Sequence, residues 1–451
     1  MRKEMFSHEI NILRDTYRRL LRRQAKTNLI KLTRKTHPAD LAILFRHFSL
    51  EEQIEIFTLM NENEHTAEFL TELDDSLVND LLSNEKLERI ASIIEKAPTS
   101  DQSGILNTLE EEKAQSVIEL LNVDEQEEIA EIMGYPEDSA GSLMNTEVFT
   151  LHESITAGEA IKTLQDQEDA EMVFYLYITD DDDRLVGVIS LRILTTTPST
   201  TTLKDIMIKN VHTIRPETDQ EEVARIVAQY NFLAVPVIDP ESHLLGIVTV
   251  DDVVDVIQDE AEEDLLRLSG VAETDIYRAT LETMWGRFTW LLVNLGTAIL
   301  ASIVIYQFDG SLEKMVALAV LMPIVASMGG NAGTQTMTVA VRAIATRDLN
   351  MGNLGRVLGK ELLVALANGG IFAILAGGAA ALWYKDYPLG LVIGGAMIIN
   401  MITAGLFGLV IPVILWRLRI DPATAAGVLL TTVTDVVGFL AFLGLGALFL
   451  L

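Results

Sequence analysis

Residues 389–415 read LGLVIGGAMIINMITAGLFGLVIPVIL, a run of 27 residues without a charged side chain. A transmembrane helix needs about 20 mostly apolar residues, so this run is long enough to cross a bilayer. Four further mostly apolar runs, each with only one or two charged residues, lie at 285–306, 315–345, 357–383 and 422–450. The sequence therefore predicts five transmembrane helices within residues 285–451.

The second run, residues 315–345, is too long for one straight crossing. It contains Pro323 and the pair Gly329-Gly330. Proline removes a backbone hydrogen bond and glycine weakens a helix, so a kinked or broken helix is expected here. Asn331 follows the glycines and offers an uncharged oxygen to a water-filled path; the alternative for this segment is a tight helix crossing.

Charge divides the chain into two unlike halves. The whole chain has a formal net charge of −31, but residues 285–451 carry +2 and residues 1–284 carry −33. A single soluble globule is excluded, because the apolar runs are too long to be buried in one core. An acidic half repels phosphates, so no nucleic-acid partner is expected. The absence of cysteine excludes disulfides and thiolate metal sites.

Basic residues in the short connections predict the orientation in the membrane. The second-to-third connection carries Arg347 and Arg356, and the fourth-to-fifth carries Arg417 and Arg419. Connections rich in Lys and Arg stay in the cytoplasm. The acidic half and the N-terminus are therefore expected in the cytoplasm, and the C-terminus outside.

Residues 140–262 contain two similar units of about 60 residues, each with the expected element order β-α-β-β-α. Each unit has a similar hairpin end, Leu185-Val186-Gly187-Val188 in the first and Leu244-Leu245-Gly246-Ile247 in the second. Such a repeat is typical of a CBS pair, a regulatory module that is usually dimeric and often holds an adenosine ligand. Upstream, apolar residues recur at helical spacing through residues 1–135, which predicts helices.

The predicted fold is a multidomain membrane protein. Its parts are an all-α helical N-domain (1–135), an α/β tandem CBS pair (136–200 and 201–262), a long connecting helix (263–284) and a five-helix transmembrane domain (285–451). Eight carboxylates lie between Asp251 and Asp264, where the CBS pair approaches the membrane. Like charges this close repel, so the segment is either a solvated helix face or a site for a divalent cation.

Asp435 is the only charged residue in Val428–Leu451. A carboxylate deep in a membrane costs about 2.5–3.5 kcal/mol on insertion scales, so it usually faces water, a partner or an ion. Thr431 and Thr434 add hydroxyl oxygens nearby. This set suits the path of a hard, hydrated cation. The alternative is a structural hydrogen bond to a neighbouring helix.

The chain resembles the MgtE family of bacterial magnesium channels over nearly its whole length, from the helical N-domain through the CBS pair and connecting helix to the five spans. The most specific parts of the resemblance are Gly329–Gln335 with Val341–Thr346, and Asp421–Ala423 with Thr432–Gly438. The resemblance implies a homodimer in the bacterial inner (plasma) membrane, with a Mg²⁺ pore between protomers lined by the fifth helix. It makes Asp435 the pore carboxylate that holds hydrated Mg²⁺, and gives pore-lining positions to Asn331 and Gly427.

The resemblance also implies Mg²⁺ sites between the cytosolic domains that hold the channel closed. Side chains at the matching positions belong to Asp252, Asp255, Glu260, Glu263, Asp264 and Asp421. Gly141 and Ala228 match positions that bind through the backbone. Asn231 stands where some members have a carboxylate, which implies a weaker site there.

Some members of this family bind ATP in the CBS pair. Tyr175, Arg192 and Phe232 are compatible with such a site. Ile193, however, stands where nucleotide-binding members offer an acidic group to the ribose. The sequence therefore leaves ATP open as a regulator.

The function that the resemblance implies is a Mg²⁺-selective channel into the cytoplasm, closed by Mg²⁺ that binds between its acidic domains. The alternative is a secondary Mg²⁺ or Co²⁺ transporter coupled to Na⁺ or H⁺. The sequence has no Walker A motif and no His-Glu-x-x-His motif, so neither an ATP-driven pump nor an enzyme is expected.

Overall fold

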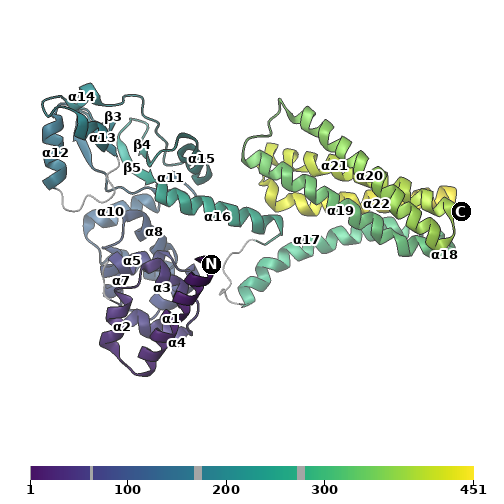
Figure 1. Cartoon of the computed structure of the whole chain (residues 1–451), viewed down its shortest axis with the longest axis horizontal. Coiled ribbons are helices and arrows are strands. Elements are labelled where there is room, and N and C mark those ends of the chain that lie inside the picture. Colours follow the sequence, from purple (N-terminus) through teal and green to yellow (C-terminus); the bar gives the residue numbers. More distant parts are fainter. Residues whose placement is uncertain (1, 61–63, 167–174, 272–279) are drawn as a thin grey trace. The chain divides into compact units, whose positions relative to one another are not determined.

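The computed structural model describes residues 2–60, 64–166, 175–271 and 280–451 (Figure 1). The chain forms two compact units, one within residues 2–260 and the other made of residues 261–271 and 280–451. Each unit has its own hydrophobic cores, and each is described by itself below.

The first unit begins with an all-α domain, as predicted. Its core contains Tyr17, Phe45, Phe57 and Phe69, all almost fully buried. The short helices begin at local caps: Ser49 and Glu52, for example, form a reciprocal capping box at the start of one of them. Among the described residues the helices are α1 (Arg2–Arg22), α2 (Lys26–Thr33), α3 (Pro38–Phe45), α4 (Leu50–Thr58), α5 (Glu64–Thr71), α6 (Asp75–Leu82), α7 (Leu87–Ile94), α8 (Thr99–Asn107), α9 (Glu111–Ile118) and α10 (Val123–Ile132).

The CBS pair follows as two α/β modules. The first contains α11 (Ala140–Leu143), β1 (Thr150–His152), α12 (Ala157–Asp166), β2 (Tyr175–Thr179), β3 (Leu185–Ser190) and α13 (Leu191–Thr196). The second contains α14 (Leu203–Ile206), α15 (Gln220–Tyr230), β4 (Ala234–Ile238) and β5 (Leu244–Thr249). The predicted strand at 173–179 and helix at 155–167 each include residues outside the described part of the chain.

The hairpins of the two modules pair their strands in the same register, and this equivalence supports the internal repeat. β2 pairs antiparallel with β3 and places Ile178 opposite Gly187, and β4 pairs antiparallel with β5 and places Val237 opposite Gly246. The register shifts immediately after this pair in both hairpins. β1 adds a parallel strand beside β2, whereas the second module has only a parallel bridge from Ile214 to Val237.

The helix after the CBS pair begins earlier than residue 263, where the connecting helix was predicted to start. α16 runs from Val250 to Leu268 and therefore contains most of the acidic segment. Its start is fixed by Thr249 and Asp252, because Asp252 Oδ2 accepts hydrogen bonds from the Thr249 amide at 3.0 Å and hydroxyl at 2.6 Å. Residues 272–279 of the predicted connecting helix lie outside the described residues.

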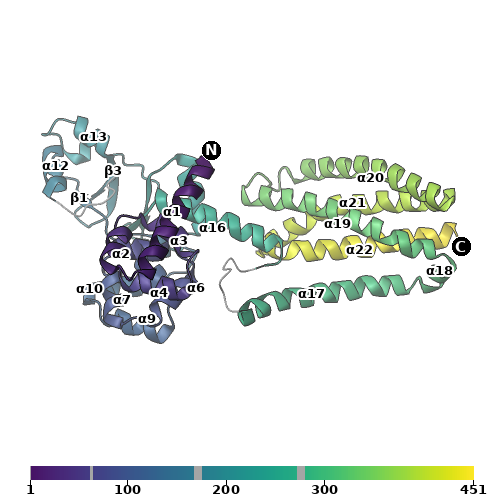
Figure 2. The ribbon, with the colours of Figure 1, turned by 60° about the horizontal axis from the view of Figure 1, so that its bottom comes forward.

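The second unit contains five helices long and apolar enough to cross a membrane, as predicted. In Figure 2, α19, α21 and α22 run side by side, and α17 lies along α22. α21 is the most buried of the five, and α17 is exposed along nearly its whole length. The described helices are α17 (Thr280–Tyr306), the short α18 (Asp309–Lys314), α19 (Val316–Ala345), α20 (Leu354–Tyr384), α21 (Tyr387–Arg417) and α22 (Pro422–Phe449).

A kinked or broken second span was expected, and the break is wrong, because α19 is one continuous helix through Pro323 and the glycines. The kink stays a prediction. Packing explains why the helix is continuous. Gly329 and Gly333 are buried against Asn400 of α21 and Leu430 of α22. Neighbouring transmembrane helices make proline and glycine tolerable within a helix that would be weak alone.

Candidate ion pathway and metal-binding residues

Three predicted pore residues lie along one face of α22. Gly427, Thr431 and Asp435 are four residues apart, a spacing that stacks them on a single side of a helix. Thr431 is exposed, and Gly427 and Asp435 are half-buried. The Thr431 hydroxyl donates to the Gly427 carbonyl at 2.5 Å. The second unit thus leaves a polar strip ending in a carboxylate accessible within its membrane-spanning part.

α19 brings a second polar segment beside this strip. A Cβ atom at Gly330 would lie 3.8 Å from Thr431 Cγ2, so the two helices meet closely at this point. Asn331 is the next residue, and its side chain is exposed, with Nδ2 3.5 Å from Ser327 Oγ. The predicted pore residues of two helices are therefore neighbours in space.

Thr434 differs from Thr431 in its position. It is fully buried, and its hydroxyl donates to the carbonyls of Leu430 and Thr431, both at 3.1 Å. Both hydroxyls donate to carbonyls of their own helix, so burial separates the two residues: Thr434 is covered by the bundle within one protomer, whereas Thr431 is exposed. Of the two threonines, Thr431 is the one that the packing leaves available.

One guanidinium joins two of the predicted metal ligands. Arg267, near the end of α16, forms ion pairs with Glu263 on the preceding turn and with Asp421 Oδ2 at 3.4 Å. Asp421 also caps α22, because its Oδ1 accepts from the Ala423 amide at 2.9 Å. Arg267 was not among the residues predicted for the site, although its i,i+4 spacing from Glu263 predicts an ion pair on one helix face.

The end of α16 touches the beginning of α22. Leu268 packs against a cluster that includes Ala423 and Ala426. Its carbonyl oxygen lies 3.9 Å from the point where a Cβ atom of Gly427 would be. The last turn of α16 therefore lies next to the first residue of the polar strip.

In the first unit, Asp255 on α16 faces a carboxylate of the helical domain. Glu72, which follows α5, carries a raised pKa because it is partly removed from water and lies near the negative charges of Asp255 and Glu68. Partial burial and the charge of Asp251 also raise the pKa of Asp255. Two partly buried carboxylates that raise each other's pKa, or have it raised by other negative charges, are stabilised by a shared cation or proton.

The remaining predicted ligands have other local partners. Burial raises the pKa of Asp252, against the opposing effect of the hydrogen bonds from Thr249. Glu260 Oε1 accepts from Gln220 Nε2 at 2.7 Å. Gly141 is buried against Tyr135, and Ala228 is exposed on α15. Asp264 is half-buried on α16.

Within the described residues of one protomer, no three His, Asp or Glu side chains gather closely enough to hold a metal ion. Among the predicted sensor ligands, Glu263 and Asp421 are joined through Arg267, and Asp252 lies near Asp255. Asp255 also lies near Glu72, which the sequence did not predict as a ligand. Asn231, at the end of α15, adopts a left-handed backbone conformation, which an asparagine tolerates well.

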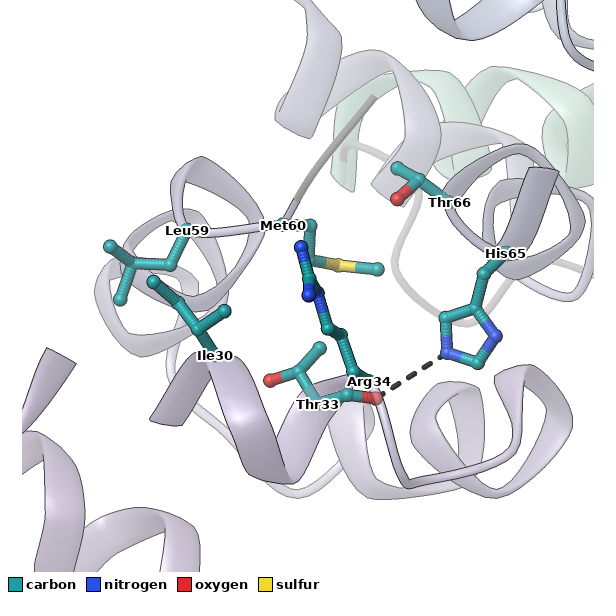
Figure 3. Close-up of a pocket in the computed structure, with 7 residues that line it drawn as sticks. All are labelled: Ile30, Thr33, Arg34, Leu59, Met60, His65 and Thr66. Carbon is teal, nitrogen blue, oxygen red and sulfur yellow. Dashed lines mark hydrogen bonds between the residues drawn. The ribbon is translucent and has the colours of Figure 1, made fainter. Parts of the chain in front are cut away.

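Figure 3 shows a small pocket in the helical domain, between α2, α4 and α5. His65 Nε2 lies 3.4 Å from the Thr33 carbonyl oxygen. The cavity volume is roughly 10 Å³, which leaves room for about one water molecule. No carboxylate lines this pocket, so it is no candidate for a Mg²⁺ site; its residues are Ile30, Thr33, Arg34, Leu59, Met60, His65 and Thr66.

The residues considered for ATP lie in both CBS modules. Tyr175 begins β2 and is half-buried, and Arg192 is exposed on α13. Phe232 stacks on Tyr230, with ring centroids 5.4 Å apart and an interplanar angle of 18°. Ile193 packs against the core of the first module, so it offers no hydrogen-bond acceptor to a ribose.

Comparison with known protein families assigns all three regions of the chain. Residues 322–445 match the divalent cation transporter domain MgtE, residues 36–138 match the MgtE intracellular N domain, and residues 140–197 and 203–259 match CBS domains. The magnesium transporter MgtE of Thermus thermophilus is 34% identical over 94% of this chain and 95% of that protein. The chain belongs to the MgtE family.

Further relatives within the MgtE family agree with this assignment. MgtE of Enterococcus faecalis is 36% identical over 72% of each chain, and MgtE of Bacillus subtilis is 29% identical over 92% of each. Membership confirms the predicted helical domain, CBS pair and transmembrane domain. It also makes magnesium transport the class of activity of this chain.

Two solved structures of soluble parts resemble the first unit. One is the cytosolic domain of the Mg²⁺ channel MgtE in complex with ATP, with a TM-score of 0.52 and 33% identity over 54% of this chain and 99% of that chain. The other is the soluble part of a magnesium transporter, with a TM-score of 0.51 and 29% identity over 56% of this chain and 99% of that chain.

Proposed function

We propose that this chain is a Mg²⁺-selective channel that carries Mg²⁺ into the cytoplasm, and that cytosolic Mg²⁺ closes it. The observation that carries the proposal is the uncovered strip of Gly427, Thr431 and Asp435 beside Asn331. Mg²⁺ gives up its water reluctantly, so neutral oxygens and a carboxylate can hold it through its hydration shell. A bare ion is not needed.

A homodimer supplies what one protomer lacks. The strip lies at the surface of the second unit, where a second copy could face it and bring a second Asp435 to the path. Two carboxylates balance the charge of one Mg²⁺. The membrane potential, worth about 2.3 kcal/mol per charge per 100 mV, drives a divalent cation inward without a coupled ion.

Closure is proposed to use the carboxylates of α16. The last turn of this helix lies beside Gly427, so its position decides whether the strip is accessible from that end. Mg²⁺ bound at these carboxylates, which are Asp255 and Glu260 in the first unit and Glu263 and Asp264 in the second, would hold α16 in one place. Because the ion binds this arrangement better, it shifts the population towards the closed state.

Reconstitution in liposomes tests channel function against coupled transport. The purified full-length protein is placed in vesicles that contain a Mg²⁺ indicator, with a K⁺ diffusion potential and no Na⁺ or H⁺ gradient. A channel gives Mg²⁺ entry driven by the potential alone, and single-channel currents in a planar bilayer. Entry that appears only with a Na⁺ or H⁺ gradient would instead establish a secondary transporter.

The nucleotide question yields a prediction about Ile193. If Tyr175, Phe232 and Arg192 recognise adenosine and phosphate, then ATP binding is weakened because Ile193 gives the ribose no hydrogen-bond acceptor. Ile193→Asp should then tighten ATP binding by about tenfold, because a hydrogen bond to a charged group contributes about 1.5–3 kcal/mol. Isothermal titration of the full-length protein with ATP measures this.

The control for this prediction is Ile193→Ala, which removes the same apolar contact without adding an acceptor. Thermal unfolding of both variants reports the cost of disturbing the core. Equal ATP affinity in Ile193→Asp, Ile193→Ala and wild type would show that this position does not face a bound ribose.

A further inference from the structure

Asn400 is a fully buried polar residue in the middle of α21. Its Nδ2 donates to the backbone carbonyl of Val325 in α19 at 2.8 Å. Its Oδ1 is also buried and has no hydrogen-bond partner among the described residues. An amide buried in this way is unusual within an apolar helix, where leucine or isoleucine fills the same volume.

Two glycines on two other helices make room for this amide. A Cβ atom at Gly438 of α22 would lie 2.7 Å from Asn400 Nδ2, and one at Gly329 of α19 would overlap the same amide. A helical side chain covers the turn before its own Cα, so the absence of one at Gly329 uncovers the Val325 carbonyl. The amide therefore fills a gap that both glycines leave open.

These contacts lie next to the candidate ion pathway. Gly329 comes two residues before Asn331, so the two lie on nearly opposite sides of α19, and Gly329 is buried whereas Asn331 is exposed. Gly438 comes three residues after Asp435, so the two lie on the same side of α22, one turn apart. Gly438 is buried and Asp435 is half-buried. Asn400 thus touches the buried side of α19 and the part of α22 that adjoins Asp435.

Folding alone gives little reason for an asparagine here. The hydrogen bond to Val325 is favourable, but the unpaired Oδ1 carries a desolvation cost of similar size. Replacement of a buried polar group by an apolar one of the same shape is often close to neutral for stability. Leucine has nearly the shape of asparagine. The role of Asn400 is therefore expected to lie in how it positions the neighbouring helices.

We propose that Asn400 is a positioning residue for Mg²⁺ passage: it fixes the distance and rotation of α19 against α22, and so the placement of Asn331 relative to Asp435. This inference rests on the proposed channel function for its transport consequence. Its geometric part stands independently of transport, because it concerns the contact between two helices of one protomer.

The geometric part is tested by cross-linking, for which the absence of natural cysteine is convenient. Gly330 and Thr431 face each other, so the double variant Gly330→Cys, Thr431→Cys should form a disulfide upon mild oxidation. The loss of free thiols measures the rate of this oxidation. Addition of Asn400→Leu should slow this oxidation by about fivefold, since disulfide formation tolerates little displacement. An unchanged oxidation rate would overturn the proposal.

The transport part compares Asn400→Leu with wild type in the liposome assay. Mg²⁺ entry should fall by about tenfold while thermal unfolding in detergent stays unchanged or shifts upwards, since small displacements of positioned groups have large effects on rate. A merely structural role would lower both together. The matched control is Asn294→Leu, because among the described residues Asn294 Nδ2 donates to the Trp290 carbonyl of its own helix, at 3.1 Å, and not to another helix.

The outcomes separate the two proposals. Wild type without Mg²⁺ entry would refute the channel, and the cross-linking result would still decide the role of Asn400. Wild-type entry in Asn400→Leu, with a wild-type oxidation rate, would refute the positioning role alone. If Asn400→Leu does not fold, Asn400→Ala serves in its place, because the gap it leaves should slow the oxidation as well.

Discussion

Replacement of Asp435 by asparagine is expected to reduce Mg²⁺ entry by about 100-fold. The change keeps the shape of the side chain and removes only its charge. A charge-assisted contact is worth up to about 3 kcal/mol, which corresponds to two orders of magnitude in rate or affinity. Because the proposed homodimer would lose both carboxylates at once, the effect should be at the upper end of this range. The liposome assay measures it directly.

Asp386→Asn is the matched control for this prediction. Asp386 caps α21 through a hydrogen bond from the Leu389 amide at 3.1 Å, and asparagine caps helices equally well. The control should transport Mg²⁺ like wild type. Entry at the wild-type rate in a folded Asp435→Asn variant would contradict the placement of the ion path along α22.

The parts of the fold that were predicted correctly depend on local or repeated patterns. The fourth span was predicted at 389–415 and forms α21 over Tyr387–Arg417, because the mean hydropathy of such a run changes sharply at its ends. The CBS repeat could be identified because each unit carries its own hairpin. The early start of α16 also had a local signal, the capping pair Thr249 and Asp252, but Asp252 was interpreted only as a metal ligand.

The errors and omissions depend on contacts between distant segments. The broken second span was inferred from Pro323 and the glycines, but α21 and α22 hold that helix together. Thr431 and Thr434 look equivalent in the sequence, and only packing decides that the second is buried. Asn400 lies inside an apolar run, and its significance depends on Gly329 and Gly438, which no spacing rule connects to it.

The candidate sensor residues show the same difference between what the sequence predicts and what only the structure reveals. The acidic segment predicts a cation site by charge alone, and its assignment to single residues came from resemblance. The structure adds Arg267, which forms ion pairs with Glu263 and Asp421 and offsets part of their negative charge. A resident guanidinium there means that Mg²⁺ must compete with an internal cation, so these carboxylates are expected to bind it more weakly than an unpaired set.

Combined neutralisation of Asp255, Glu260 and Glu263, as Asn, Gln and Gln, is expected to abolish the response of the channel to cytosolic Mg²⁺. Two like charges about 4 Å apart repel by roughly 4 kcal/mol at an effective dielectric of 20, and Mg²⁺ relieves this repulsion in wild type. The variant loses both the repulsion and the ligands. Its activity should therefore stay constant as cytosolic Mg²⁺ is varied, whatever its level.

Limited trypsin digestion tests this at Arg267, which is the only Lys or Arg between residues 258 and 270. With Mg²⁺ at about ten times its dissociation constant, cleavage there should slow about tenfold in wild type, because bound ligand reduces the open population by that factor. The triple variant should show almost no change. The control neutralises Asp259 and Glu262, two exposed carboxylates of the same helix, and should behave like wild type. Equal protection of the triple variant and the control by Mg²⁺ would show that the acidic face of α16 is only a solvated surface.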